Sequence, residues 1–128
     1  MDPSSVQRWY ETRLASTPDL SGALAGLVDA HATLTACFRG GHKCLLAGNG
    51  GSFADCLHIA GELAKSFEAP RPLTTAQAEA LGTGPDADRL RAGLEQGLPV
   101  VVLGANGSVL TAVLNDRTDS GLVLAQEC

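Results

Sequence analysis

The sequence is poor in aromatic residues and has fewer basic than acidic ones. Aromatic side chains make up 4% of its 128 residues, which argues against recognition of nucleic acid by base stacking. Lysine and arginine total 9, whereas aspartate and glutamate total 14, so the formal net charge is −5. Because no basic patch is present, neither nucleic acid nor an anionic membrane is expected as a partner.

The chain also lacks a long apolar run, a secretory signal and a paired-cysteine motif. No apolar stretch approaches the roughly 18 residues that span a bilayer. The first residues, MDPSSVQRWYETRL, contain neither the basic nor the apolar region of a signal peptide. The absence of CxxC is typical of reduced thiols rather than of a disulfide framework; the cysteines are Cys37, Cys44, Cys56 and Cys128. These absences predict a soluble, cytoplasmic protein.

What the sequence does contain predicts one globular domain, since 45% of the residues are apolar. Apolar runs next to glycine predict two strands, the first buried on both faces, and helical spacing predicts the other elements. The expected strands are 44–47 and 98–105; the expected helices are 4–15, a second one ending before Gly40, 52–67, one or two within 74–97, 106–116 and a fragment within 120–128. This order predicts α/β architecture with parallel strands.

Short polar side chains are placed to cap two of these helices. Asp19 or Ser21 can cap the second helix of the chain. Asp86 or Asp88 can cap a helix that follows the turn segment GTGPDAD.

The stretch GNGGSFADCLHIAGEL, residues 48–63, joins a glycine-rich turn to a helix. The glycines allow positive φ and let the backbone approach a ligand closely. The start of the helix offers free N–H groups and the positive end of a dipole, which bind phosphate, and Ser52 adds a hydroxyl there. The same residues are equally compatible with a tight strand-to-helix connection in which Ser52 only caps the helix.

Within the helix, His58 and Glu62 lie one turn apart, so both can reach one metal ion or one substrate atom. The alternative is a solvated pair that contributes a few tenths of a kcal/mol. The distance between this pair and the turn suits a small sugar phosphate that bridges them. The expected polar face is Asp55, His58, Glu62 and Lys65 or Ser66; the expected apolar stripe is Cys56, Ile59 or Ala60, Leu63 and Phe67.

Residues 48–63 resemble the signature of the phosphoheptose isomerase family, a branch of the sugar isomerase (SIS) fold. That signature has Gly-Asn-Gly-Gly-Ser, then Asp, His and Glu-Leu at the same separations. The resemblance continues more loosely in RPL at 71–73 and in LPVVVLGANGSVLTAVLNDRTDSGLVLAQ from residue 98, and it covers most of residues 20–126. It implies one Rossmann-like SIS domain of three α/β/α layers, made of N-terminal helices (1–40), the motif segment (41–73), an insert (74–97) and a second strand with helices (98–128).

The resemblance also implies the reaction and the residues that serve it. The reaction is the metal-dependent isomerisation of sedoheptulose 7-phosphate to glycero-manno-heptose 7-phosphate. Ser52 would hold the substrate's phosphate, and further substrate contacts would come from Asn49, Gly50 and Gly51.

A second group of residues is implied to carry the chemistry. His58 and Glu62 would ligate Zn²⁺, and Glu62 would also move a proton between two carbons of an ene-diol intermediate. Asn115 and Asp116 would line the same site.

Members of the family continue beyond the length of this sequence with a phosphate loop, Ser-Thr-Ser-Gly-Asn-Ser, and a late helix whose Gln and His complete the metal site. The resemblance therefore implies the N-terminal part of an SIS domain, truncated at its C-terminus, with an incomplete zinc site. Two alternatives stay open: a non-catalytic SIS module that binds a sugar phosphate or a protein partner, and an inactive remnant. Exposed strand and helix surfaces, together with the family's closed assemblies, predict a homo-oligomer with the helix before Gly40 at the interface.

Overall fold

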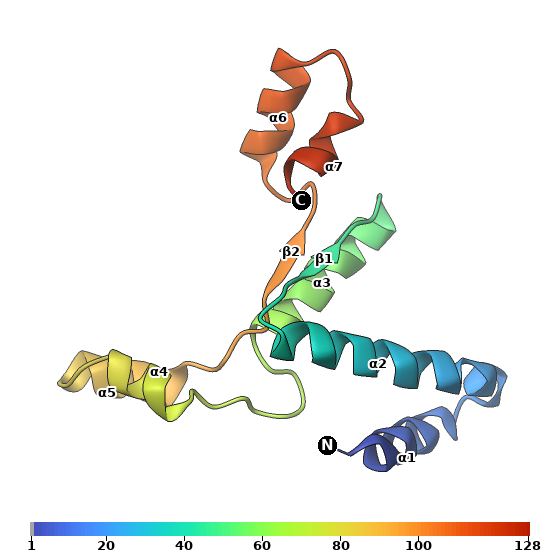
Figure 1. Ribbon diagram of the computed structural model, residues 1–128, viewed down its shortest axis with the longest axis vertical. Helices are drawn as coiled ribbons and strands as arrows, with labels where there is room; N and C mark the ends of the chain where they lie inside the picture. Colours follow the sequence, from blue (N-terminus) through green and yellow to red (C-terminus); the bar gives the residue numbers. More distant parts are fainter. Residues whose placement is uncertain (1) are drawn as a thin grey trace. The chain divides into compact units, whose positions relative to one another are not determined.

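The computed structural model describes residues 2–128, which form two compact units, one ending at His42 and one running from Lys43 to Cys128. The first unit contains α1 (Pro3–Leu14), the 3-10 helix η1 (Pro18–Ala23) and α2 (Leu24–Arg39). The second contains β1 (Cys44–Leu46), α3 (Gly51–Ala64), α4 (Thr75–Ala80), α5 (Pro85–Gly93), β2 (Val100–Val102), α6 (Gly107–Asp116) and α7 (Leu122–Gln126) (Figure 1). That the whole chain folds as one domain stays a prediction.

In the first unit, α1 packs against α2. Asp2 caps α1 by accepting hydrogen bonds from the backbone N–H groups of Ser4 and Ser5. The ring of Tyr10 meets that of His31 edge to face, with ring centroids 6.4 Å apart, an arrangement that aromatic pairs favour. His31 therefore has a packing role between the two helices.

The predicted capping of α2 by Asp19 or Ser21 is wrong. Both residues lie inside η1, and α2 starts after Ala23 without a side-chain cap. The reason is that η1 runs directly into α2, so the N–H of Leu24 already donates to the carbonyl of Ser21. A preceding helical turn thus replaces the side-chain cap.

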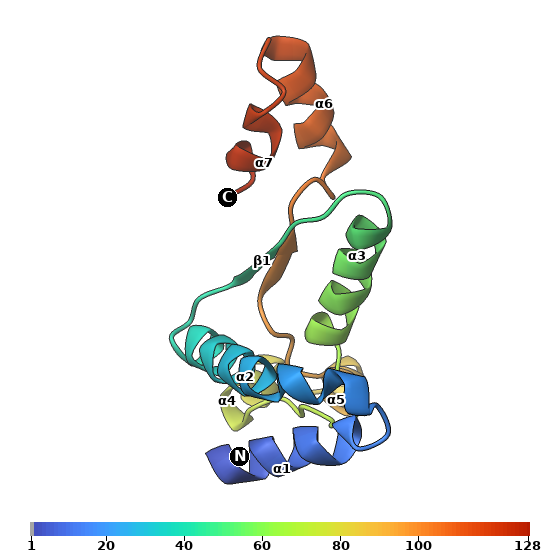
Figure 2. The same cartoon turned by 90° about the vertical axis from the view of Figure 1, so that its right-hand side faces the viewer.

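The second unit contains a two-stranded parallel sheet, in which Cys44, Leu45 and Leu46 pair with Val100, Val101 and Val102 in order. The predicted α/β architecture with parallel strands is confirmed, although both strands are shorter than expected. Burial of the first strand on both faces is wrong, because Leu45 is 40% exposed. Within this unit α3 packs against β2 (Figure 2), so β1 receives less cover than β2, whose Val102 is buried.

The helix α3 ends at Ala64, earlier than its apolar pattern predicts. Lys65 has an extended backbone with φ −133° and ψ 141°, which leaves Phe67 beyond the helix and 81% exposed. Cys56 is buried and Ala60 half-buried on the inner side, whereas Ile59 is 45% exposed. Of the two alternatives for the apolar stripe, Ala60 is therefore the correct one.

The insert contains two short helices, as expected. Thr74 and Gln77 form a capping box at the start of α4. Capping of α5 by Asp86 or Asp88 is wrong, because the cap position is occupied by Gly84 and both aspartates lie in the first turn. There they still face the positive end of the helix dipole.

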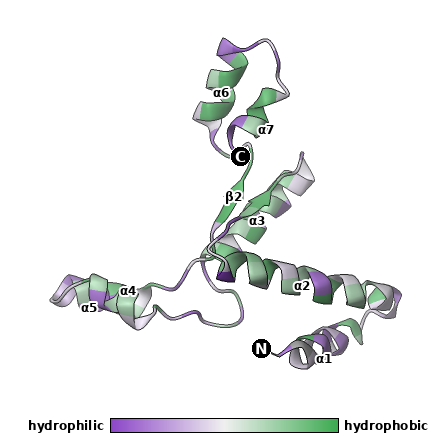
Figure 3. Ribbon diagram, in the orientation of Figure 1, coloured by the Kyte–Doolittle hydropathy of each residue, from purple (hydrophilic) through white to green (hydrophobic). Residues whose placement is uncertain are grey.

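The packed interior is small. Among the described residues, seven are buried, and none of the large side chains is less than 2% exposed; the buried residues are Val6, Cys56, Ser66, Ala87, Val102, Leu103 and Val123. Hydrophobic residues are prominent on β2, α3 and α6 (Figure 3). None of the helices within residues 2–128 combines the length and apolar character needed to cross a membrane.

Candidate functional site

The turn between β1 and α3 depends on glycine at two positions. Gly50 has φ 56° and ψ −121°, which match the first central position of a type II′ turn and strongly favour glycine. The N–H of Ser52 donates to the carbonyl of Asn49 at 3.1 Å and closes that turn. A Cβ on Gly48 would lie 2.7 Å from backbone atoms of Ser52, whereas one on Gly51 would meet nothing within 4 Å. The backbone therefore requires two of these glycines, and the third faces open space.

The start of α3 leaves some polar groups available to a ligand. Its N-cap is Gly50, without a side-chain cap, so the interpretation of Ser52 as the cap is wrong. The N–H groups of Ser52 and Phe53 are engaged, donating to the carbonyls of Asn49 and Gly50 at 3.1 Å each. In the described part of the chain the N–H of Gly51 has no acceptor, and the hydroxyl of Ser52 is exposed. These two groups can meet an anion at the positive end of the helix dipole.

His58 and Glu62 lie side by side on the outer face of α3. His58 Nε2 is 3.6 Å from Glu62 Oε1, and the two side chains are 79% and 37% exposed. Asp55 lies one turn earlier and is also exposed. The expected fourth member of this face is absent, because Lys65 and Ser66 follow the end of the helix and Ser66 is buried. One carboxylate, one imidazole and a second carboxylate thus face solvent along α3.

These residues do not by themselves make a metal centre. Nowhere in residues 2–128 are three His, Cys, Asp or Glu side chains grouped so that they could hold a metal ion. Zinc sites in proteins use three or four protein ligands. The pair of His58 and Glu62 supplies two, so a complete site requires donors from outside the described chain.

The C-terminal end of α3 is held by Arg71, a residue for which the pattern RPL predicts no structural role. Its Nη2 donates to the carbonyl of Leu63 at 2.7 Å and to that of Glu62 at 3.3 Å. Its Nε donates to the carbonyl of Gln96 at 2.9 Å. An arginine just after the proline that follows a helix was the available signal, since cationic side chains bind the last carbonyls of helices.

The exit from the insert adds a second link to this end of α3. The N–H of Ser66 donates to Glu95 Oε2 at 2.9 Å. Hydrogen bonds from Ser66, followed by the positive charges of Lys65 and Arg71, lower the pKa of the Glu95 carboxyl below its usual value. An ionised Glu95 therefore fastens the segment after α5 to the segment after α3.

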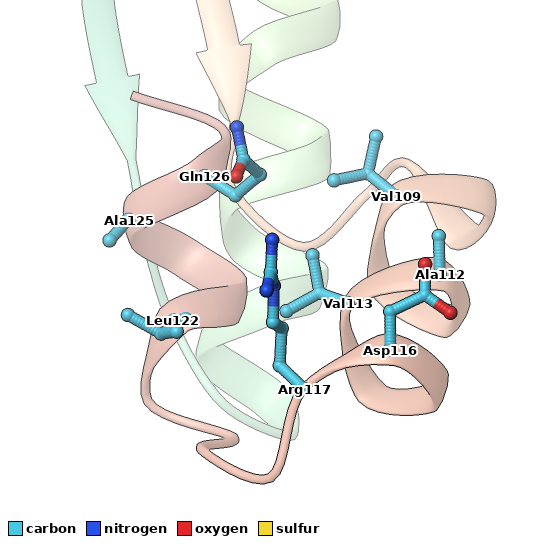
Figure 4. A pocket seen from close by; sticks show the side chains of 8 residues that line it. All are labelled: Val109, Ala112, Val113, Asp116, Arg117, Leu122, Ala125 and Gln126. Carbon is cyan, nitrogen blue, oxygen red and sulfur yellow. The ribbon is translucent and has the colours of Figure 1, made fainter.

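Asn115 and Asp116 are the last two residues of α6, far from the glycine turn in sequence. The Asn115 amide donates to Asp116 Oδ1 at 3.0 Å. Asp116 lines a pocket of about 400 Å³ between α6 and α7, across which Arg117 extends (Figure 4). The pocket is lined by Val109, Ala112, Val113, Asp116, Arg117, Leu122, Ala125 and Gln126. That Asn115 and Asp116 share a site with Ser52 and Glu62 stays a prediction.

Comparison with known proteins shows similarity to phosphoheptose isomerases. The chain is 32% identical over 118 residues to the one from Synechocystis sp., a match that covers 88% of this chain and 47% of the relative. It is 37% identical over 103 residues to the one from Bradyrhizobium sp., covering 73% of this chain and 50% of the relative. With the one from Burkholderia pseudomallei it shares 41% identity over 76 residues, covering 59% and 26%.

The chain thus spans about half the length of the first two of these relatives. No family model matches the sequence. No solved structure matches it either.

Proposed function

Because the chain belongs to the phosphoheptose isomerase family, we propose that it carries the phosphate-binding turn and the acid/base helix of a sugar-phosphate isomerase. The observation that supports this most directly is the layout of α3. The N-terminus of α3 has no side-chain cap and carries the hydroxyl of Ser52. His58 and Glu62 lie further along the same helix, on its exposed face. Ten residues of α helix rise about 15 Å, so a seven-carbon sugar phosphate comes nearer to bridging Ser52 and Glu62 than a triose phosphate does.

In this proposal the phosphate of sedoheptulose 7-phosphate binds at the turn. The Ser52 hydroxyl and the Gly51 N–H donate to it, and Asn49 and Gly50 contact the sugar beside it. Binding at the start of a helix uses the dipole and free backbone donors, which offsets the shortage of basic residues in the chain.

Glu62 is the proposed acid/base. Its carboxylate takes a proton from C1 of the ketose while the C2 carbonyl becomes the enediolate oxygen. The carboxylic acid then returns the proton to C2, a proton moves from O1 to O2, and C1 becomes the aldehyde carbon, so no atom is gained or lost. A carboxylate held within hydrogen-bond reach of such a carbon acid typically accelerates the transfer by 10²–10⁴-fold, to order of magnitude.

Three finer features belong to the same proposal. The fold would be a three-layer SIS domain, with Asn115 and Asp116 lining the site. Zn²⁺ would bind His58 and Glu62 only if another segment or chain supplied the remaining ligands. The setting would be the cytoplasm.

Self-association is proposed on separate grounds. Within residues 2–128 each strand of the sheet has a single partner, and apolar side chains such as Leu34 on α2 and Leu45 on β1 are 40% exposed. Open strand edges and exposed apolar surface favour assembly. We expect a homo-oligomer with α2 at the interface, and a single monomeric species in sedimentation at micromolar concentration would contradict it.

A non-catalytic module that binds a sugar phosphate is the second candidate. The lack of a three-donor group among the described residues favours it. Incubation of the purified chain with sedoheptulose 7-phosphate in D₂O, with and without Zn²⁺, separates the two. An isomerase forms an aldose that carries deuterium at C2 and exchanges deuterium into C1 of the remaining ketose, whereas a module binds the sugar phosphate without either change.

A further inference from the structure

The last turn of α3 is tied to the segment that leads into β2 by a single side chain. The Arg71 guanidinium donates to three carbonyl groups, those of Glu62 and Leu63 in α3 and that of Gln96 after the insert. The half-buried position of Arg71 keeps these bonds partly out of water. One of the three carbonyls belongs to Glu62, the residue proposed above as acid/base.

Backbone bonds run parallel to this side-chain link. The N–H of Gln96 donates to the carbonyl of Arg71 at 2.7 Å, and that of Leu98 donates to the carbonyl of Leu63 at 2.8 Å. The backbone of Gly97 also lies close to α3, since a Cβ there would be 3.1 Å from the carbonyl oxygen of Ala64. Arg71 is therefore at the centre of a small backbone junction between α3 and segment 96–98.

The chemistry of this junction needs arginine. The last carbonyls of a helix have no partner within it, and such ends fray when they are left to water. A guanidinium presents several N–H donors in a fixed plane, so it can bond carbonyls of two segments at once. A lysine ammonium can replace one of these bonds but not the planar arrangement.

We infer that Arg71 is a positioning residue, whose bonds to the Glu62 and Leu63 carbonyls hold the last turn of α3 and so fix the Glu62 carboxylate beside His58. The inference rests on the proposed role of Glu62. The junction would then serve catalysis as well as the fold, because the Glu62 carboxylate lies in the last turn of α3, which would fray without these bonds.

The test compares Arg71→Met and Arg71→Lys with a matched control, Arg91→Met. Arg91 also bonds two carbonyls, donating to that of Ala78 at 2.9 Å and to that of Gly82, but both lie inside the insert. Three measurements are made on each full-length variant. The first is hydrogen exchange at the N–H groups of Lys65 and Leu98, and the second is the set of three-bond couplings that report the χ1 rotamer of Glu62. The third is deuterium incorporation at C1 of sedoheptulose 7-phosphate, measured together with the dissociation constant of that sugar phosphate.

In Arg71→Met we expect the two amides to exchange about tenfold faster or more, because bonds from a charged donor have been lost. The Glu62 couplings should move towards rotamer-averaged values. Deuterium incorporation should fall about tenfold, while the dissociation constant changes less than about twofold, since the phosphate turn is at the other end of α3. Arg71→Lys should recover part of each loss, and Arg91→Met should leave all three readouts as in the wild type.

Two results would overturn the inference. Unchanged amide exchange in Arg71→Met would show that the junction does not need the guanidinium. Faster exchange with unchanged Glu62 couplings would make Arg71 a structural residue only. If the wild-type chain incorporates no deuterium at all, the proposed isomerase fails, and the couplings alone still decide whether Arg71 positions Glu62.

Discussion

The two ends of α3 satisfy their backbone groups in opposite ways. At the C-terminal end, Arg71 takes up the carbonyls of Glu62 and Leu63, and the N–H of Leu98 adds a second bond to Leu63. At the N-terminal end, Gly50 provides no side-chain cap, and the N–H of Gly51 has no acceptor among the described residues. One end of the helix is closed by the protein itself, and the other is left for water or a ligand.

The start of α6 sharpens this contrast, because it also follows a strand and a glycine. There Asn106 caps the helix by accepting from the N–H groups of Ser108 and Val109. The start of α3 therefore lacks the side-chain acceptor that the start of α6 has. An anion at the start of α3 would supply the acceptor that Asn106 supplies at α6.

The largest expected effect is on proton transfer by Glu62, at the C-terminal end of α3. Glu62→Gln keeps the size of the side chain but removes the base, so deuterium incorporation at C1 of sedoheptulose 7-phosphate should fall by about 10²–10⁴-fold. Affinity for the sugar phosphate should change little. Asp55→Asn is the control, because Asp55 is exposed on the same helix one turn before His58. Equal losses in both variants would contradict a specific role for Glu62.

The next largest effect is expected from substitutions in the glycine turn at the N-terminal end of α3. Gly48→Ala places a Cβ against backbone atoms of Ser52, so the turn must shift; steric overpacking of this kind costs about 1–3 kcal/mol. Gly51→Ala adds its methyl group in open space at the first position of α3 and should be neutral or slightly stabilising. Urea unfolding of both variants measures the difference, and a Gly48→Ala variant as stable as Gly51→Ala would contradict the close approach.

Ser52→Ala, which removes a single hydroxyl at the N-terminal end of α3, should have a smaller effect. The loss of one hydroxyl donor to a charged phosphate should weaken sedoheptulose 7-phosphate binding by about tenfold. Stability in urea should stay the same, because Ser52 is exposed and is not the cap of α3. Ser108→Ala, at the equivalent position of the capped helix α6, should leave affinity unchanged. Calorimetric titration gives both values, and equal affinities for Ser52→Ala and the wild type would argue against phosphate at this turn.

The smallest expected effect is a pH dependence of the hydrogen bond between the Ser66 N–H and the Glu95 carboxylate, next to the C-terminal end of α3. The folded-state pKa of Glu95 is lowered from 4.5, so its contribution to stability is present above that value and is lost as the pH falls through the lower, folded-state pKa. Hydrogen exchange at the Ser66 N–H, corrected for intrinsic rates, should therefore accelerate under acid conditions. Glu95→Gln should remove this dependence. If the Glu95→Gln variant kept the same pH dependence, another group would be responsible.

Much of the local structure could be predicted from the residues themselves. Apolar runs bounded by glycine located both strands, and the insert produced the two short helices expected in 74–97. Errors concentrated at helix ends. Asp19, Ser21, Asp86 and Asp88 were all suitable caps by residue type, but a continuing helical turn or a glycine occupied the cap positions instead. Residue type indicates that a cap is possible, whereas the path of the preceding chain decides where the helix begins.

In the candidate site too, local features could be predicted from the sequence and contacts between distant segments could not. The spacing of His58 and Glu62 placed them on one face because helical periodicity is local, and their 3.6 Å approach agrees with it. Arg71 was missed because its partners are separated from it by between 8 and 25 residues. Nothing in the pattern RPL says which carbonyl groups will come within reach.

The glycine turn, the parallel α/β order and the pairing of His58 with Glu62 on one face of α3 therefore follow from the sequence, since each depends on backbone preferences over a few neighbouring residues. Which end of α3 is closed depends on contacts between segments that are distant in the sequence. That closure requires the chain to leave the helix, form the insert and return at segment 95–98, where Glu95 accepts from the N–H of Ser66 and the carbonyl of Gln96 accepts from Arg71. Such a junction depends on where two distant segments meet in space, and hydrogen-bond partners at that range carry no periodic signal in the sequence.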